Sequence, residues 1–96
     1  MNRARVVASL RDLVVQAGAI AEGSEWHLFG SIDRDEFNAS DIDLMILCID
    51  DSQADSLRQA IDPDSLALPL HLSLMTYAEA AEVDAVRLQQ ASRIYP

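Results

Sequence analysis

Two aspartates, Asp41 and Asp43, stand two positions apart where a polar segment gives way to a strongly apolar run. Side chains at i and i+2 of a strand lie on the same face, about 6.6 Å apart along the backbone. Two like charges this close repel each other, and a bound divalent cation reverses the repulsion. Mg²⁺ binds to one or two carboxylates together with water and substrate phosphate. The pair is therefore a candidate metal site, with a pair of solvated turn residues as the alternative.

A second group that could take part in chemistry is Gly30-Ser31. It follows a short aromatic segment, and nine residues separate it from Asp41. Glycine lets a phosphate approach the backbone, and turn amides with a hydroxyl group can hold phosphate oxygens. Gly-Ser and the aspartate pair together predict a site for a nucleoside triphosphate and Mg²⁺.

The segment LFGSIDRDEFNASDIDLMI (residues 28–46) resembles the signature of the DNA polymerase beta-like nucleotidyltransferase superfamily, in its minimal nucleotidyltransferase branch. In that signature an apolar residue precedes Gly-Ser, and a short segment leads to Asp-apolar-Asp-apolar. Gly30-Ser31 and Asp41-Ile42-Asp43-Leu44 match it, and Ser40 is also typical. The expected order of helices and strands resembles the whole minimal domain, so the resemblance covers nearly the entire chain.

The resemblance implies an α+β nucleotidyltransferase fold, a small mixed β-sheet with helices packed on one face. It implies transfer of a nucleoside monophosphate, AMP first among the candidates, from ATP or another nucleoside triphosphate to an acceptor hydroxyl. Gly30 and Ser31 would hold the triphosphate, while Asp41 and Asp43 would be catalytic and bind one or two Mg²⁺ ions. Such a metal site places the reactants and stabilises the developing charge.

One position departs from the family pattern. The family has a third carboxylate on the following strand, where this chain has His71. Neutral imidazole is a poor Mg²⁺ ligand beside oxygen donors, but it can accept the proton of an acceptor hydroxyl as a general base. A strand histidine satisfied by nearby carboxylates or water is the alternative, so the sequence leaves catalytic competence open.

Members of this branch commonly act as the antitoxin of a two-gene pair and adenylylate a helical HEPN-type toxin ribonuclease. The resemblance therefore implies a HEPN-type protein as partner and source of the hydroxyl group, with a homo-oligomer as the other possible assembly. The alternative function is a degenerate nucleotidyltransferase-fold subunit that binds and neutralises its partner without transfer, and His71 favours it. A simple calcium binder is disfavoured because one aspartate pair supplies too few oxygen ligands.

Length and charge limit the number of domains, the kinds of partner and the location that we expect for this protein. With 96 residues, the chain is expected to form a single domain, 1–96. Its net charge is −9, all seven basic residues are arginine, and direct nucleic-acid binding is therefore disfavoured. We expect no membrane association and a cytoplasmic location, because the apolar stretches are too short for a membrane span and Cys48 has no second cysteine to pair with.

The hydrophobic pattern predicts the elements that must position these residues, in the order helix, strand, strand, helix, strand, helix. Residues 44–49 lack alternation and predict a central strand covered on both faces, whereas 68–75 alternate and predict a half-exposed strand. Ser52 with Asp55 and Thr76 with Glu79 resemble capping boxes. The expected ranges are helices at 2–21, 52–61 and 77–90, strands at 26–29, 44–49 and 68–75, and a surface excursion at 32–40 with room for one helical turn.

Overall fold

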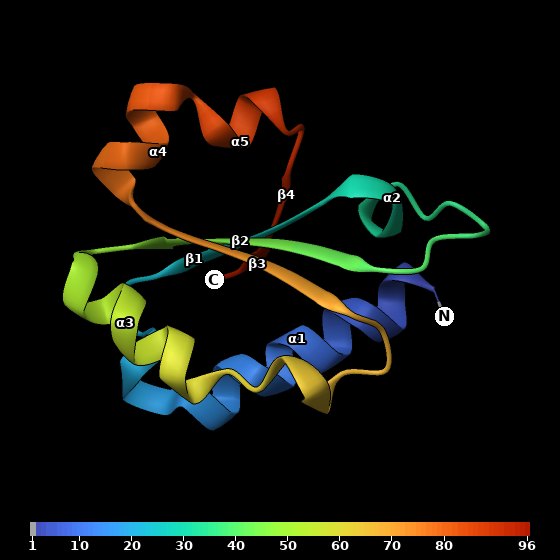
Figure 1. The fold of residues 1–96 in the computed structure, drawn as a ribbon, viewed down its shortest axis with the longest axis horizontal. Helices are drawn as coiled ribbons and strands as arrows, with labels where there is room; N and C mark the ends of the chain where they lie inside the picture. The colour runs from blue at the N-terminus through green and yellow to red at the C-terminus, as the bar shows by residue number, and fades with distance from the viewer. Residues whose placement is uncertain (1) are drawn as a thin grey trace.

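A four-stranded mixed sheet forms the centre of the protein in the computed structural model, which describes residues 2–96 (Figure 1). The strand order is β3-β2-β1-β4, in which β1 pairs antiparallel with both β2 and β4, and β2 pairs parallel with β3. The elements in chain order are α1 (Arg3–Ala17), η1 (Gly18–Ala21), β1 (Glu25–Phe29), α2 (Gly30–Asp33), β2 (Ile42–Cys48), α3 (Asp51–Ala60), η2 (Pro63–Ser65), β3 (Leu70–Thr76), α4 (Tyr77–Val83), α5 (Ala85–Leu88) and β4 (Ser92–Tyr95).

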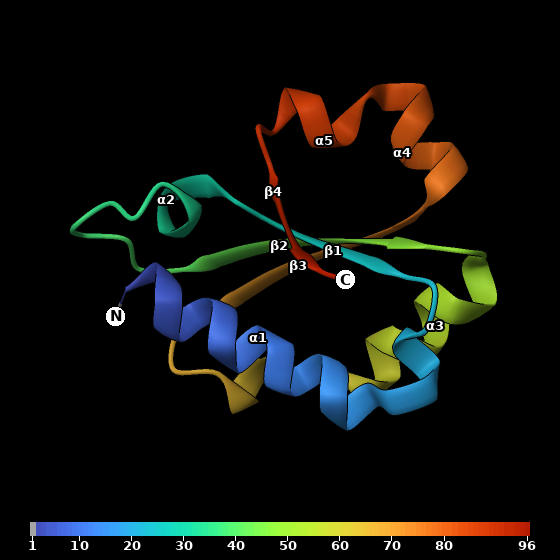
Figure 2. The ribbon, with the colours of Figure 1, turned by 180° about the vertical axis from the view of Figure 1, so that it is seen from behind.

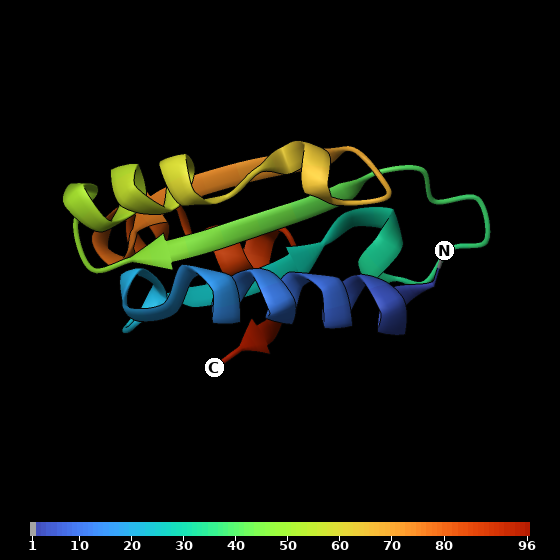
Figure 3. The ribbon, with the colours of Figure 1, turned by 90° about the horizontal axis from the view of Figure 1, so that it is seen from below.

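The two longest helices, α1 and α3, lie side by side across one face of the sheet (Figure 3). Alternate residues of β2 face them, among them Leu44, Ile46 and Cys48, each fully buried. The buried side of α1 carries apolar residues at helical spacing, from Val6 to Val14. This layer holds most of the hydrophobic core and fixes which side chains of β2 point to the opposite face.

The opposite face of the sheet is covered in part by α4 and α5 (Figures 1 and 2). Met45 and Leu47 of β2 pack there with Ala80 and Ala85 in a second apolar cluster. The expected small mixed sheet with helices is confirmed, but the helices lie on both faces rather than on one. The reason is that β2 is apolar on both sides, so its second face also needs cover.

Two expectations for the C-terminal third are wrong. The predicted helix 77–90 is divided because Asp84 adopts a left-handed conformation, with φ 53°, and ends α4. The chain then forms β4, which pairs with the free edge of β1 and has no counterpart in the predicted order. A four-residue strand has too short a pattern to stand out, and its Ile94 is buried only because the fold brings it beneath α1.

Helix capping follows the sequence at one site and departs from it at another. Thr76 and Glu79 form the expected capping box at the start of α4. The predicted Ser52–Asp55 box is wrong, because the Asp50 side chain accepts the hydrogen bond from the Gln53 amide and starts α3 earlier. Both residue types cap well, and Asp50 has the extended backbone conformation of an N-cap residue.

The remaining strands and helices lie close to their predicted ranges. Within residues 2–96, none of the helices is both long and apolar enough to cross a membrane. Cys48 is buried in the core, and this burial, followed by the charge of Asp50, raises the pKa of its thiol to about 11. The thiol is therefore a protonated packing group at neutral pH.

Candidate functional site

The carboxylate of Asp43 lies directly against the backbone of Gly30, where β1 ends and α2 begins. A Cβ atom built on Gly30 would be 3.1 Å from Cγ of Asp43 and only 2.2 Å from its Oδ2, and the second distance is shorter than real Cβ contacts. Gly30 also has φ +76°, a conformation that disfavours side chains other than hydrogen. Glycine at this position thus provides both the turn and the space for the Asp43 carboxylate, whereas the close approach of a phosphate, which the sequence suggests here, stays a prediction.

The sheet register explains why the candidate residues meet. Asp43 is opposite Phe29 on β1 and opposite His71 on β3, so the three side chains form a row across one face. This row lies on the same face of the sheet as Met45 and Leu47. It is at the N-terminal end of β2, away from α4 and α5 (Figure 1).

Asp41 precedes β2 and lies near the same row. Its Oδ2 atom is 3.2 Å from Nε2 of His71, and both side chains are well exposed. Asp41 precedes Asp43 by two residues, and its negative charge raises the pKa of the Asp43 carboxyl group. The structure therefore brings Asp41, Asp43 and His71 together beside Gly30, and places Ser31 one residue further along α2.

The electrostatic environment of Asp43 opposes its ionisation. Partial burial raises the pKa of its carboxyl group, and the negative charge of Asp41 raises it further. The charges of His71 and Arg34 act in the opposite direction but do not reverse the shift. A carboxylate held in a partly desolvated position beside another carboxylate is stabilised by any cation that binds between them.

Two further polar residues have partners of their own. His27 is buried in β1, and its Nε2 lies 3.0 Å from Oε1 of Glu25. Arg34 is exposed, and its Nε lies 2.6 Å from Oε2 of Glu36. Its effect on Asp43 was missed, because the helical turn that brings it near the carboxylate was expected only somewhere within 32–40.

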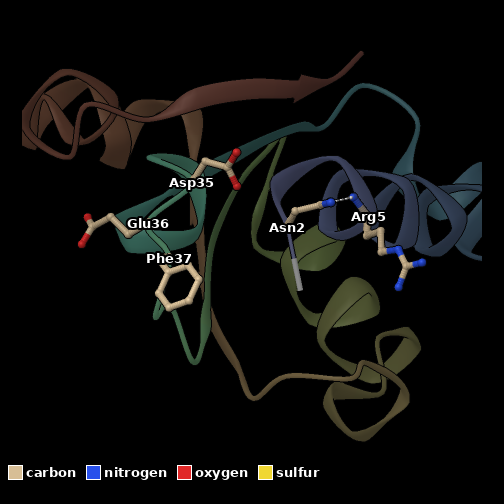
Figure 4. Close-up of a pocket in the computed structure, with 5 residues that line it drawn as sticks. All are labelled: Asn2, Arg5, Asp35, Glu36 and Phe37. Atoms are coloured by element: carbon tan, nitrogen blue, oxygen red, sulfur yellow. Dashed lines mark hydrogen bonds between the residues drawn. The ribbon is translucent and has the colours of Figure 1, made fainter.

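Three surface cavities in the described part of the chain lie away from this row of residues. The largest, of about 530 Å³, lies between the start of α1 and the loop after α2 (Figure 4). The other two, of about 260 and 240 Å³, lie at the start of α3 and beneath α4 and α5. None of the three is lined by Gly30, Ser31, Asp41, Asp43 or His71. Gly30, Ser31, Asp41 and Asp43 are half-buried and His71 is exposed, so the candidate site lies at the protein surface.

The donor set fits a hard cation that keeps much of its water. Over residues 2–96, no group of three or more His, Cys, Asp or Glu side chains is arranged to hold a metal by itself. Asp41 and Asp43 supply two neighbouring carboxylates, which is the number that Mg²⁺ commonly takes from protein when a substrate phosphate supplies further oxygens. A metal at this site would therefore depend on its nucleotide.

Comparison with family models, with curated proteins and with solved structures gives no match to this chain. The resemblance to nucleotidyltransferases thus rests on the Gly-Ser and Asp-x-Asp residues and stays a prediction.

Substitution of Gly30 by alanine should move the Asp43 carboxylate, because the added Cβ would occupy its position. We expect the free energy of unfolding to fall by about 1–2 kcal/mol from backbone strain alone. Gly18→Ala is the matched control, since Gly18 also has positive φ but has no atom within 4 Å of the added Cβ. Carbon-13 NMR of the aspartate side chains should show a changed Asp43 signal only in Gly30→Ala, and an unchanged signal would contradict the described contact.

The raised pKa of Asp43 predicts a pH dependence of stability. As the pH rises from 3.8, the pKa of an unperturbed aspartate, through the higher pKa of folded Asp43, the unfolded chain loses its proton first. The free energy of unfolding therefore falls across this window. Asp43→Asn has no such ionisation, so it should be more stable than the wild type above the window and gain nothing below it. Urea denaturation at several pH values tests this, with Asp12→Asn on the exposed side of α1 as control.

Proposed function

We propose that this protein is a minimal nucleotidyltransferase that transfers a nucleoside monophosphate from a nucleoside triphosphate to a hydroxyl group of a partner protein. The observation that carries the proposal is the contact between the Asp43 carboxylate and the Gly30 backbone, with Asp41 alongside. The Gly30–Ser31 turn, whose amides could hold phosphate oxygens, and a pair of carboxylates that would attract a cation are the two parts of the proposed metal–nucleotide site. Their residue types and order also match the family signature in residues 28–46.

Asp41 and Asp43 would hold Mg²⁺ in this site, and Gly30 and Ser31 would hold the triphosphate. Mg²⁺, when bound, neutralises phosphate charge and favours displacement at phosphorus. The two carboxylates hold the cation beside the Gly30–Ser31 turn, while the open surface around them admits a second macromolecule. ATP is the first nucleotide to test, because AMP transfer is what the family resemblance implies.

In the proposed reaction, the acceptor oxygen forms a bond to the α-phosphorus, and the bond from that phosphorus to the bridging oxygen breaks. Pyrophosphate leaves with the bridging oxygen, and the acceptor hydroxyl loses its proton. His71 would accept that proton, a role supported by its register position next to Asp43. If the neutral ring carries its proton on Nε2, which lies 3.2 Å from Oδ2 of Asp41, the unprotonated Nδ1 can act as the base.

A partner protein would complete the open surface. A HEPN-type toxin is the partner that the family resemblance implies, and the chain's net charge of −9 favours association with a basic protein. The antitoxin role follows from this proposal, since modification of the partner at a hydroxyl group would neutralise it. A second copy of the chain is the other assembly to consider.

A second candidate function is favoured by the contact between His71 and Asp41. His71 occupies the register position next to Asp43 where the family has its third carboxylate, and its Nε2 lies 3.2 Å from one of the proposed metal ligands. A chain that has lost this acid can retain the fold and bind its partner without transferring a nucleotide. In that case the protein is a binding subunit that neutralises its partner by contact alone.

Incubation of the protein with labelled ATP, Mg²⁺ and a candidate HEPN-type partner distinguishes the enzyme from the binding subunit. For the enzyme, mass spectrometry should find an added nucleotide on the partner. Asp43→Asn should lower the rate roughly 100-fold or more, because loss of a metal ligand removes several kcal/mol of transition-state stabilisation. Asp12→Asn, which also removes one negative charge, is the matched control and should retain the wild-type rate.

The same experiment identifies the binding subunit. No transfer by the wild type, together with a stable complex that Asp41→Asn and Asp43→Asn leave unchanged, would contradict the enzymatic function and support the second candidate. His71→Asp then provides a further test: restored transfer would indicate that the lost carboxylate alone prevents the reaction.

A further inference from the structure

The last residue of α2, Asp33, holds an almost completely buried carboxylate that the functional proposal does not use. Its side chain is 8% exposed. The Oδ1 atom accepts a hydrogen bond from Nε of Arg3 at 3.1 Å, and Oδ2 accepts one from the hydroxyl of Ser92 at 2.9 Å. Both oxygens are thus bound by side chains from other parts of the chain. A charged group is buried at considerable cost unless it is paired in this way.

The partners of Asp33 come from the two ends of the sequence. Arg3 is the first residue of α1, and Ser92 is the first residue of β4. The backbone N–H of Arg3 also donates to Oδ1 of Asp35, just after α2, at 3.1 Å. Figure 2 shows the start of α1 and the segment around α2 at the same end of the molecule. Asp33 therefore joins three elements that the order of the chain keeps apart.

Helix α2 needs such support because it is only four residues long. A single turn of helix is not stable by itself, since one or two backbone hydrogen bonds do not compensate for the order imposed on the chain. The turn has few internal bonds, among them those from the Arg34 amide to the Gly30 carbonyl and from the Glu36 amide to the Ser31 carbonyl. Contacts with the rest of the protein must hold it in place.

The position of α2 determines the candidate site. Its first residue is Gly30, whose backbone lies against the Asp43 carboxylate, and its second is Ser31. Asp33 is at the other end of the same turn, so a shift of its side chain would tilt the segment and move the Gly30–Ser31 amides relative to β2. Pairing between β4 and β1 holds Ser92 in place, and β1 leads directly into Gly30.

We propose that Asp33 is a positioning residue that clamps α2 between Arg3 and Ser92 and so fixes the Gly30–Ser31 turn against Asp43. Its effect on nucleotide binding rests on the proposed function, whereas its effect on the position of α2 does not. Asp33 touches neither nucleotide nor metal in this proposal. It acts through the turn.

Asp33→Ala tests the clamp by two measurements on the same variant. Hydrogen exchange followed by NMR should show the amides of Arg34 and Glu36 exchanging at least about tenfold faster, because hydrogen bonds to a charged group are lost, while amides of β2 keep their rates. The KM for ATP in the transfer assay should rise by a similar factor, with a smaller change in kcat. Asp35→Ala is the matched control: it removes an exposed carboxylate of the same segment, which accepts only the Arg3 backbone bond among the described contacts.

The outcomes separate the clamp from the proposed function. Unchanged exchange at Arg34 and Glu36 in Asp33→Ala would overturn the clamp, whatever the enzyme does. A third result is also informative: exchange is faster in Asp33→Ala but not in Asp35→Ala, and the wild-type protein binds no nucleotide. This result would support the clamp and contradict the proposed function. Should Asp33→Ala fail to fold, Ser92→Ala removes one of the two contacts and should produce the same local increase in exchange to a smaller extent. No local increase in that variant would overturn the proposal.

Discussion

The close approach of the Asp43 carboxylate to the Gly30 backbone is the contact on which the rest of the site depends. It requires glycine in a left-handed conformation at the end of β1, and it requires β1 and β2 to pair in the register that places Asp43 beside that end. The core formed by α1, α3 and the other side of β2 holds this register, because a shift by one residue would bring Asp43 into the apolar core and expose Leu44.

The same contact has a cost in stability. Partial burial and the neighbouring charge of Asp41 raise the pKa of Asp43, so its ionised form opposes folding at neutral pH. Charged groups whose pKa is perturbed by burial and by a like charge often belong to functional sites. A structural role gives no reason to keep two acids here, since asparagine would fill similar space without the repulsion. The proposed cation, bound between the two carboxylates, would supply that reason.

The long, strongly patterned parts of the fold could be predicted from the sequence, and the parts that depend on tertiary contacts could not. The uninterrupted apolar run of β2 and the helical spacing of α1 identified both elements, and Asp43 lies beside Gly30 of the Gly-Ser turn as the sequence suggested. The break at Asp84 and the strand β4 were missed, because each depends on what the rest of the chain offers for packing. The contact between His71 and Asp41 agrees with the alternative that the sequence left open, a strand histidine satisfied by a nearby carboxylate, but which carboxylate it meets depends on the parallel pairing of β2 with β3.

A crystal structure of the protein with Mg²⁺ and a non-hydrolysable ATP analogue tests the metal–nucleotide site most directly. The expected result is a triphosphate beside the Gly30–Ser31 turn, with Mg²⁺ bound by Asp41 and Asp43 and by phosphate oxygens. A nucleotide bound elsewhere, or a structure in which the two carboxylates stay free of metal at saturating Mg²⁺ and nucleotide, would contradict it.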